Sequence, residues 1–304
     1  MTVATFENQL VVVTGAGSGI GRATAKRFAV QGAQVVVSDI NGDAGQRTVE
    51  EIGALGGRGF SYAIDVGDSA AMENFAAEVY SDHGAPAVVV NNAGFTTAGP
   101  FLNHTVQDWD RIMAVNFWGV VLGSRLFGRQ MIAAGRGGRI LNVTSPAAVL
   151  PIPLSTAYCT SKAAAQMFTE CLRLEFAGTA VGVTAVLPAF INTGFYPNAQ
   201  VVESEKRSVA RGRNISVLIA QRVARSPETV ARHIVRIASR NPALAPTPFE
   251  SRIACASGRL SPAAARMAAR MMDIDSLVAF LDRMLPAAAM ERFDDAVARA
   301  VTDA

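Results

Sequence analysis

Short apolar runs alternate with longer helical patterns along the first two thirds of the chain. The runs are rich in β-branched residues and are expected to form buried strands at 10–14, 34–38, 59–64, 87–90, 139–143 and 181–187. Helical patterns occupy 19–31, 43–55, 70–83 and 107–134, and a further helix is expected to run through Tyr158 and Lys162 to Phe176. Elements in this order form βαβ units. The pattern therefore predicts an α/β fold with a doubly wound parallel sheet.

The pattern changes after Pro188. Residues 193–225 are rich in arginine and have no regular period, whereas a serine followed by a proline at 226–227 marks a helix start. Three prolines between residues 242 and 248 reduce the last apolar run to an edge strand or a loop. A second serine–proline pair at 261–262 begins a helix rich in alanine and methionine. We therefore expect one domain over residues 1–245 and a helical C-terminal extension over 246–304, packed on the same domain or on a partner subunit.

The charge distribution leaves several interpretations open. Net charge is only +3, but residues 206–270 carry 13 basic and 2 acidic side chains, and residues 271–304 carry 3 basic and 7 acidic ones. The basic segment is expected to be a solvated helix face, to pair with the acidic tail within or between subunits, or to make weak peripheral contact with an anionic membrane or an acidic substrate group. No nucleic-acid partner is expected, because no recognised binding module accompanies the charge.

The N-terminus and the cysteines indicate a cytoplasmic protein. The first residues contain no basic segment followed by an apolar one, so no export signal is expected, and no apolar run is long enough for a membrane span. The 3 cysteines have no spacing typical of a metal site and would leave an odd thiol after one disulfide. We therefore expect a reduced compartment and no bound metal.

A glycine-rich turn lies where a phosphate-binding loop belongs, between the first strand and the first helix. Its candidate cofactor contacts are Gly15, Gly17, Ser18, Gly19, Ile20 and Gly21. Glycines permit a tight turn and close backbone approach, and a helix N-terminus offers free amides to a pyrophosphate. Asp39 ends the second strand at the spacing of a ribose-binding acid, which favours NAD over NADP. Arg22 is the competing signal, since an arginine there could meet a 2′-phosphate.

Tyr158 and Lys162 lie four residues apart, with Ser145 upstream. On a helix the tyrosine and the lysine would share one face, where the ammonium group can lower the pKa of the phenol. Because a free tyrosine has a pKa of about 10, work near pH 7 requires a shift of roughly 3 units. This trio predicts a general acid/base rather than a nucleophile.

With these motifs the chain resembles the short-chain dehydrogenase/reductase family over roughly residues 5–240. The matching positions are Asn91-Asn92-Ala93-Gly94, Asn116, Ser145, Tyr158, Lys162, Asp65-Val66, Pro188 and Thr193. The resemblance implies a Rossmann-type fold, a homodimer or homotetramer, and a catalytic set of Asn116, Ser145, Tyr158 and Lys162. It further implies that Asp65 and Val66 hold the adenine, that Asn92, Ala93 and Gly94 border the cofactor, and that Asn116 supports a water-linked proton path. Pro188 and Thr193 would contact the nicotinamide end, although Ala189 replaces the usual glycine. From the residues alone, Asp65 could instead cap the next helix.

By the same resemblance, residues after Gly94, Ser145 and Pro188 line the substrate pocket. They are mostly apolar and comprise Phe95, Phe101, Val149, Leu150, Ile152, Phe190 and Phe195. The expected activity is hydride transfer between NAD and an apolar secondary alcohol or ketone, or an aldehyde, lipid-like or cyclic. The alternatives are an NADP-dependent ketoreductase of the same family and a non-catalytic dinucleotide-binding sensor or scaffold.

Overall fold

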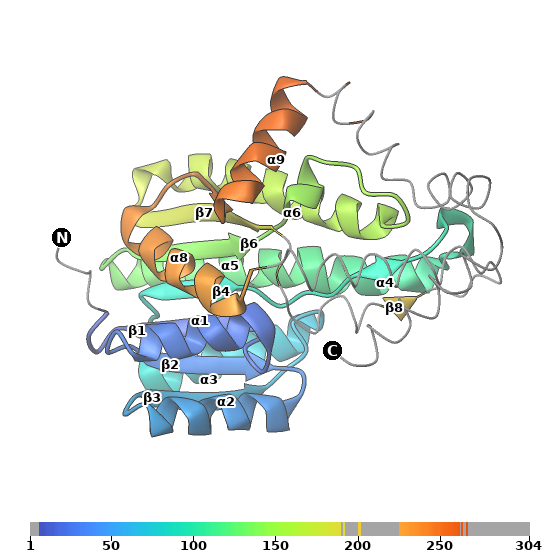
Figure 1. The fold of residues 1–304 in the computed structure, drawn as a ribbon. Helices are drawn as coiled ribbons and strands as arrows, with labels where there is room; N and C mark the ends of the chain where they lie inside the picture. Colours follow the sequence, from blue (N-terminus) through green and yellow to red (C-terminus); the bar gives the residue numbers. More distant parts are fainter. Residues whose placement is uncertain are drawn as a thin grey trace.

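The structure is a computed structural model that describes residues 6–189, 191, 200–201, 225–261, 263 and 266. Its centre is a seven-stranded parallel sheet with the strand order β3-β2-β1-β4-β6-β7-β9 (Figure 1). The strands are β1 (Leu10–Thr14), β2 (Gln34–Asp39), β3 (Arg58–Ala63), β4 (Val88–Asn91), β6 (Gly138–Val143), β7 (Val181–Pro188) and β9 (Leu244–Thr247). A second, two-stranded sheet joins β5 (Thr97–Ala98) to β8 (Gln200–Val201).

Helices cover both faces of the sheet, as a doubly wound fold requires. They are α1 (Gly19–Ala29), α2 (Gly42–Ala54), α3 (Ser69–His83), α4 (Val106–Met113), α5 (Gly119–Ala134), α6 (Thr156–Glu175), α8 (Pro227–Arg240) and α9 (Phe249–Leu260). On one face, Phe28 of α1, Ile52 of α2 and Ile234 of α8 belong to one apolar cluster with the odd-numbered valines of β1. On the other face, α3 and α5 form a second cluster with Val12 of β1. The predicted fold class is confirmed.

Several elements differ in detail from the sequence prediction. The helix expected over 107–134 is divided into α4 and α5 by a π-helical turn, Ala114–Trp118. The last strand is at the sheet edge, as its prolines predicted, and pairs only with β7 in the described part, but the domain boundary expected at residue 245 falls inside it. Helix α9 lies within the expected helical extension, but its span precedes the helix start predicted at residues 261–262. No helix of the described residues combines the length and apolarity needed to cross a bilayer.

Parallel pairing brings the carboxyl ends of the strands to one edge of the sheet. Thr14, Asp39, Asn91 and Val143 end β1, β2, β4 and β6, and Asp39 and Val143 each lie one residue beyond the partners of Thr14 and Asn91. The glycine turn, the Asn92–Gly94 segment and Ser145 follow three of these strand ends directly. Side chains that are distant in sequence therefore gather at this edge, which is the usual ligand site of such sheets.

Candidate active site

The turn after β1 can be built only with glycine at its key positions. Gly15 has φ +61°, and a Cβ there would lie 2.8 Å from the Cα of Ala93. A Cβ on Gly21 would lie 2.0 Å from the carbonyl oxygen of Gly15, and one on Gly17 would lie 2.8 Å from Asp39. Ser18 begins α1 without a capping side-chain hydrogen bond, Gly19 has φ +51°, and Ile20 packs on the core. The turn therefore exposes backbone amides at the N-terminus of α1.

Asp39 holds the turn from the neighbouring strand. Its carboxylate accepts hydrogen bonds from the amide of Gly17 at 2.8 Å and from the amide of Asn41 at 2.9 Å. Arg22, the competing cation, lies 3.5 Å from Glu51 of α2, which also pairs with Lys26. The acid therefore lies at the turn, while the arginine is paired with a carboxylate.

Asn92 fixes the same turn from the end of β4. Its Nδ2 donates to the carbonyl oxygens of Thr14 at 2.9 Å and Gly15 at 3.2 Å. The Thr14 hydroxyl accepts from the amides of Asn92 and Ala93, both at 3.0 Å. The positioning role of Thr14 could not be predicted from the sequence, because a hydroxyl at a strand end has no distinctive pattern.

Asn91 links two strands beneath the site. Its Nδ2 donates to Asn142 Oδ1 at 2.8 Å, and Asn142 Nδ2 donates to Thr169 Oγ1 at 3.0 Å. All three side chains are buried. This network ties β4 and β6 to α6, so it supports the relative position of Asn92 and Tyr158.

Asp65 is not the cap of the following helix. Its Oδ1 accepts from the amide of Gly67 at 2.8 Å, whereas Asp68 caps α3 by accepting from Ala70 and Ala71. Asp65 is exposed, and Val66 is buried against Gly119. The carboxylate of Asp65 therefore remains open to a ligand on the outer side of its turn.

The π-helical turn places Asn116 in a fully buried position. Its Oδ1 accepts from the Phe95 amide at 3.0 Å, and its Nδ2 donates to the Phe95 carbonyl at 2.9 Å and to Ser161 Oγ at 3.0 Å. Ser161 in turn donates to the carbonyl of Tyr158 at 2.8 Å. The side chain of Asn116 thus clamps the segment after Gly94 onto α6. Both N–H groups of the Asn116 side chain are engaged, so a proton path there would use the second lone pair of Oδ1 or the backbone carbonyl.

Ser145, Tyr158 and Lys162 meet between the end of β6 and the start of α6. Ser145 Oγ accepts from the Ala147 amide at 3.1 Å and forms a hydrogen bond with the Tyr158 hydroxyl. The Lys162 Nζ donates to the Val143 carbonyl at 3.1 Å and lies 5.9 Å from the centroid of the Tyr158 ring. A Cβ on Gly94 would lie 3.2 Å from Nζ and 3.0 Å from Asn116 Oδ1, so glycine is needed there.

The protonation of this pair corrects the sequence prediction. Burial raises the pKa of Tyr158 to about 12, against a smaller lowering by the Ser145 hydrogen bond. Burial also lowers the pKa of Lys162 to about 8. The net shift of the phenol pKa is opposite to the one expected from the ammonium, because burial is the largest contribution at both groups and disfavours phenolate and ammonium alike. Tyr158 is therefore a neutral phenol at pH 7.

Only some residues of the expected substrate pocket belong to the part of the chain that the structure describes. Phe95 is half-buried under the guanidinium of Arg111, whose central carbon lies 5.5 Å from the ring centroid. Val149 packs against the cluster of Leu187 and Cys255, so it contributes to the core as well. Pro188 ends β7 as a buried residue, whereas Phe190, Thr193 and Phe195 lie outside the described residues.

The sequence model of the family described as short chain dehydrogenase matches residues 9–202. The chain belongs to this family. A short chain dehydrogenase has a Rossmann-type sheet that binds a nicotinamide dinucleotide, in agreement with the strand order and the glycine turn described above.

This short chain dehydrogenase is similar to named and solved proteins over most of its length. The Mycobacterium tuberculosis protein named “Probable oxidoreductase EphD” is 43% identical over 272 residues, which are 88% of this chain but 45% of that protein. The chain thus spans less than half the length of this relative. A Burkholderia phymatum short chain dehydrogenase/reductase solved with NAD has a TM-score of 0.72 at 29% identity, over 79% of this chain and 88% of that one. A metagenomic short-chain oxidoreductase solved with NADP has a TM-score of 0.63 at 30% identity, over 77% and 91%.

Proposed function

We propose that this short chain dehydrogenase transfers hydride between NAD and an apolar secondary alcohol or ketone, with Tyr158 as general acid/base. The observation that carries the proposal is the half-buried Tyr158, whose hydroxyl is hydrogen-bonded to Ser145 and whose ring is flanked by the buried Lys162. A tyrosine with no role in proton transfer would not require a hydroxyl and an ammonium group beside it. Their convergence at the carboxyl edge of the sheet supports proton transfer at a substrate oxygen.

The residues present fit a dinucleotide. The glycine turn leaves room that any Cβ would fill, the amides at the start of α1 can receive a pyrophosphate, and Asp39 can accept from ribose hydroxyls. Asp65 and Val66 would lie at the adenine, the Asn92–Gly94 segment would border the cofactor, and Pro188 would lie near its nicotinamide end. When bound, NAD supplies the hydride acceptor or donor. The pairing of Arg22 with Glu51 supports NAD rather than NADP.

The protein supplies the proton and fixes the oxygen. In carbonyl reduction the neutral Tyr158 hydroxyl donates its proton to the substrate oxygen, while Ser145 donates a second hydrogen bond to it. Ser145 can do so because its own oxygen accepts from the Ala147 amide, which orients the hydroxyl. Lys162 stabilises the phenolate that forms, and Asn116 holds the wall of the site in place. In alcohol oxidation the same proton moves in reverse.

The apolar character of Phe95 and Val149 supports an apolar substrate, which is lipid-like or cyclic. Phe190, Phe195 and Thr193 belong to the same proposal through the family resemblance alone. A homodimer or homotetramer is proposed as the assembly, by the same resemblance.

The test is the variant Tyr158→Phe, which removes only the hydroxyl. We expect NADH binding within about twofold of the native protein and a loss of kcat of at least about a thousandfold on a ketone substrate, because general acid catalysis contributes up to about 10⁴-fold. The measurement is NADH titration by fluorescence together with NADH oxidation across a panel of ketones. Native-like turnover by the variant would refute the role of Tyr158. NADH binding without turnover of any ketone by the native protein would favour a sensor or scaffold.

A further inference from the structure

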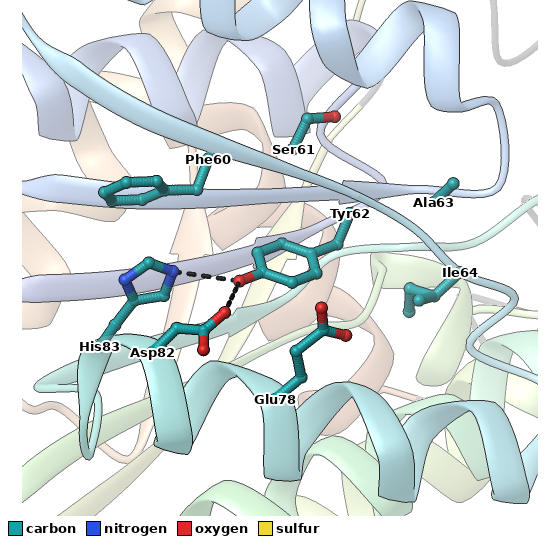
Figure 2. Close-up of a pocket in the computed structure, with 8 residues that line it drawn as sticks. All are labelled: Phe60, Ser61, Tyr62, Ala63, Ile64, Glu78, Asp82 and His83. Carbon is teal, nitrogen blue, oxygen red and sulfur yellow. Dashed lines mark hydrogen bonds between the residues drawn. The ribbon is translucent and has the colours of Figure 1, made fainter.

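A depression of about 550 Å³ lies outside the proposed active site, between β3 and α3 (Figure 2). Five consecutive residues of β3 and its end form one wall, and three residues of α3 form the other. They are Phe60, Ser61, Tyr62, Ala63, Ile64, Glu78, Asp82 and His83. The volume is within the range of sites for small molecules.

The depression is remote from the catalytic edge of the sheet. Strand β3 is the first in the sheet order and β6 the fifth, so four strand spacings of roughly 4.8 Å separate it from the strand that leads to Ser145. Asp82 and His83 end α3, which runs back from the carboxyl end of β3, so they lie toward the amino end of the strands. The end of the depression that carries Asp82 and His83 is therefore separate from the expected cofactor position, whereas Ile64 at its other end directly precedes Asp65.

Its two walls differ in chemistry. The rings of Phe60 and Tyr62 come from alternate residues of β3 and lie on one face of that strand, with His83 against Phe60 at 4.2 Å between ring centroids. Glu78 and Asp82 face them from successive turns of α3 (Figure 2). An aromatic wall opposite two carboxylates attracts a cation that carries an apolar body.

The carboxylates are available to such a ligand. Within the described part of the chain neither Glu78 nor Asp82 forms an ion pair, and Asp82 is engaged only by the Tyr62 hydroxyl, at 3.3 Å. Arg58 is exposed on the same strand, but it does not line the depression. Burial, followed by the charges of Asp82 and Glu78, raises the pKa of Tyr62 to about 12, in accord with negative potential at this place.

We propose that this depression binds a small organic amine as its ammonium ion, with the charge between Glu78 and Asp82 and the apolar part against Phe60 and Tyr62. Tyr62 also packs edge-on against Phe75 at 5.3 Å, so its ring is held by the core. The aromatic wall is thus rigid before any ligand arrives, which reduces the entropic cost of binding.

The probe is 2-phenylethylammonium, titrated into the full chain by calorimetry, with the neutral N-acetyl derivative of the same amine as the comparator. We expect the ammonium to bind and the neutral comparator to bind at least about tenfold more weakly, since only the cation gains from two carboxylates. The double variant Glu78→Gln/Asp82→Asn should lose at least about tenfold in affinity for the ammonium, and Phe60→Leu about two- to fivefold. Glu73→Gln, on an exposed turn of the same helix outside the depression, is the matched control and should bind as the native protein does.

Two results would overturn the proposal. One is the absence of ammonium binding at about 10 mM, and the other is equal affinity in the native protein and the double variant. The affected side chains are at the surface, and the melting temperature and NADH affinity of the double variant verify that it is folded. Because the measurement needs no turnover, its failure is independent of the activity proposed above.

Discussion

Burial raises the pKa of Tyr158 and lowers the pKa of Lys162, and these shifts set the protonation state of each group. With pKa values of about 12 and about 8, the phenol is neutral at pH 7 and the ammonium is mostly charged. A rise of two units above the ordinary tyrosine value corresponds to about 3 kcal/mol against the phenolate. For the proposed activity, this protonation state favours donation of a proton to a carbonyl over removal of one from an alcohol.

This state predicts opposite pH profiles for the two directions. Alcohol oxidation needs the phenolate, so its kcat/KM should rise about tenfold per pH unit from roughly pH 6 to 8, well below the Tyr158 pKa. Carbonyl reduction needs the neutral phenol and should stay level over that range, then fall as pH rises through about 8 and Lys162 loses its charge. Initial rates in both directions, in buffers of constant ionic strength, provide the measurement. A level oxidation profile from pH 6 to 8 would mean that the phenolate is already present, contrary to the effect of burial.

Some properties of single residues could be predicted from the sequence and others could not. The spacing of Tyr158 and Lys162 predicted that they share a helix face, and they do. It could not predict their pKa values, because those depend on water removed by segments distant in sequence. Likewise, Asp65 could cap the next helix by its sequence position, and the backbone path assigns the cap to Asp68 instead.

At the scale of elements, α9 is the clearest departure from the predicted pattern. Its inward side carries the small residues Ser251, Cys255 and Gly258, and its large apolar residues point outward. Phe249, Ile253 and Leu260 are 68%, 57% and 86% exposed. Apolar periodicity normally marks the buried side of a helix. Here the inward side carries only small side chains, so the apolar periodicity is missing. The residue before the helix is Pro248, so a side chain that could cap the helix is missing as well.

The inward side of α9 predicts an effect on substrate binding. A Cβ on Gly258 would lie 3.0 Å from both Leu150 Cδ2 and the Val149 carbonyl oxygen, in the segment after Ser145. Gly258→Val should displace that segment and raise KM for an apolar ketone at least about threefold, because adding carbon atoms to a packed contact forces neighbours to move. NADH affinity should remain unchanged. Ala256→Val, on the exposed side of the same helix, is the matched control in steady-state kinetics, and equal KM values for the two variants would contradict the role of α9.

At the scale of the molecule, the two halves of the sheet carry different parts of the proposed site. The strands β1, β2 and β3 carry the glycine turn, Asp39 and Asp65, while β4, β6 and α6 carry Asn92, Ser145 and Tyr158. The sequence predicted both sets, because each motif directly follows an apolar strand and parallel strands end at one edge. It predicted less after Pro188, where arginines and prolines replace the regular period, and the expected contacts of Phe190, Thr193 and Phe195 lie outside the described residues.

This division predicts that coenzyme choice can be altered without altering the proton chemistry. Asp39→Asn keeps one side-chain oxygen, so it retains the hydrogen bond from the amide of Gly17 or from that of Asn41 but not both, and it removes the charge that repels a 2′-phosphate. We expect the native protein to bind NADH at least about tenfold more tightly than NADPH, and the variant to lose most of that ratio, since a like charge about 4 Å away costs at least about 1 kcal/mol. The pH profile of the reaction should not change. Asp43→Asn, exposed in the first turn of α2, is the control. Equal loss of affinity for both coenzymes in Asp39→Asn would show that the carboxylate only shapes the turn, and native affinities that favour NADPH would refute the preference for NAD.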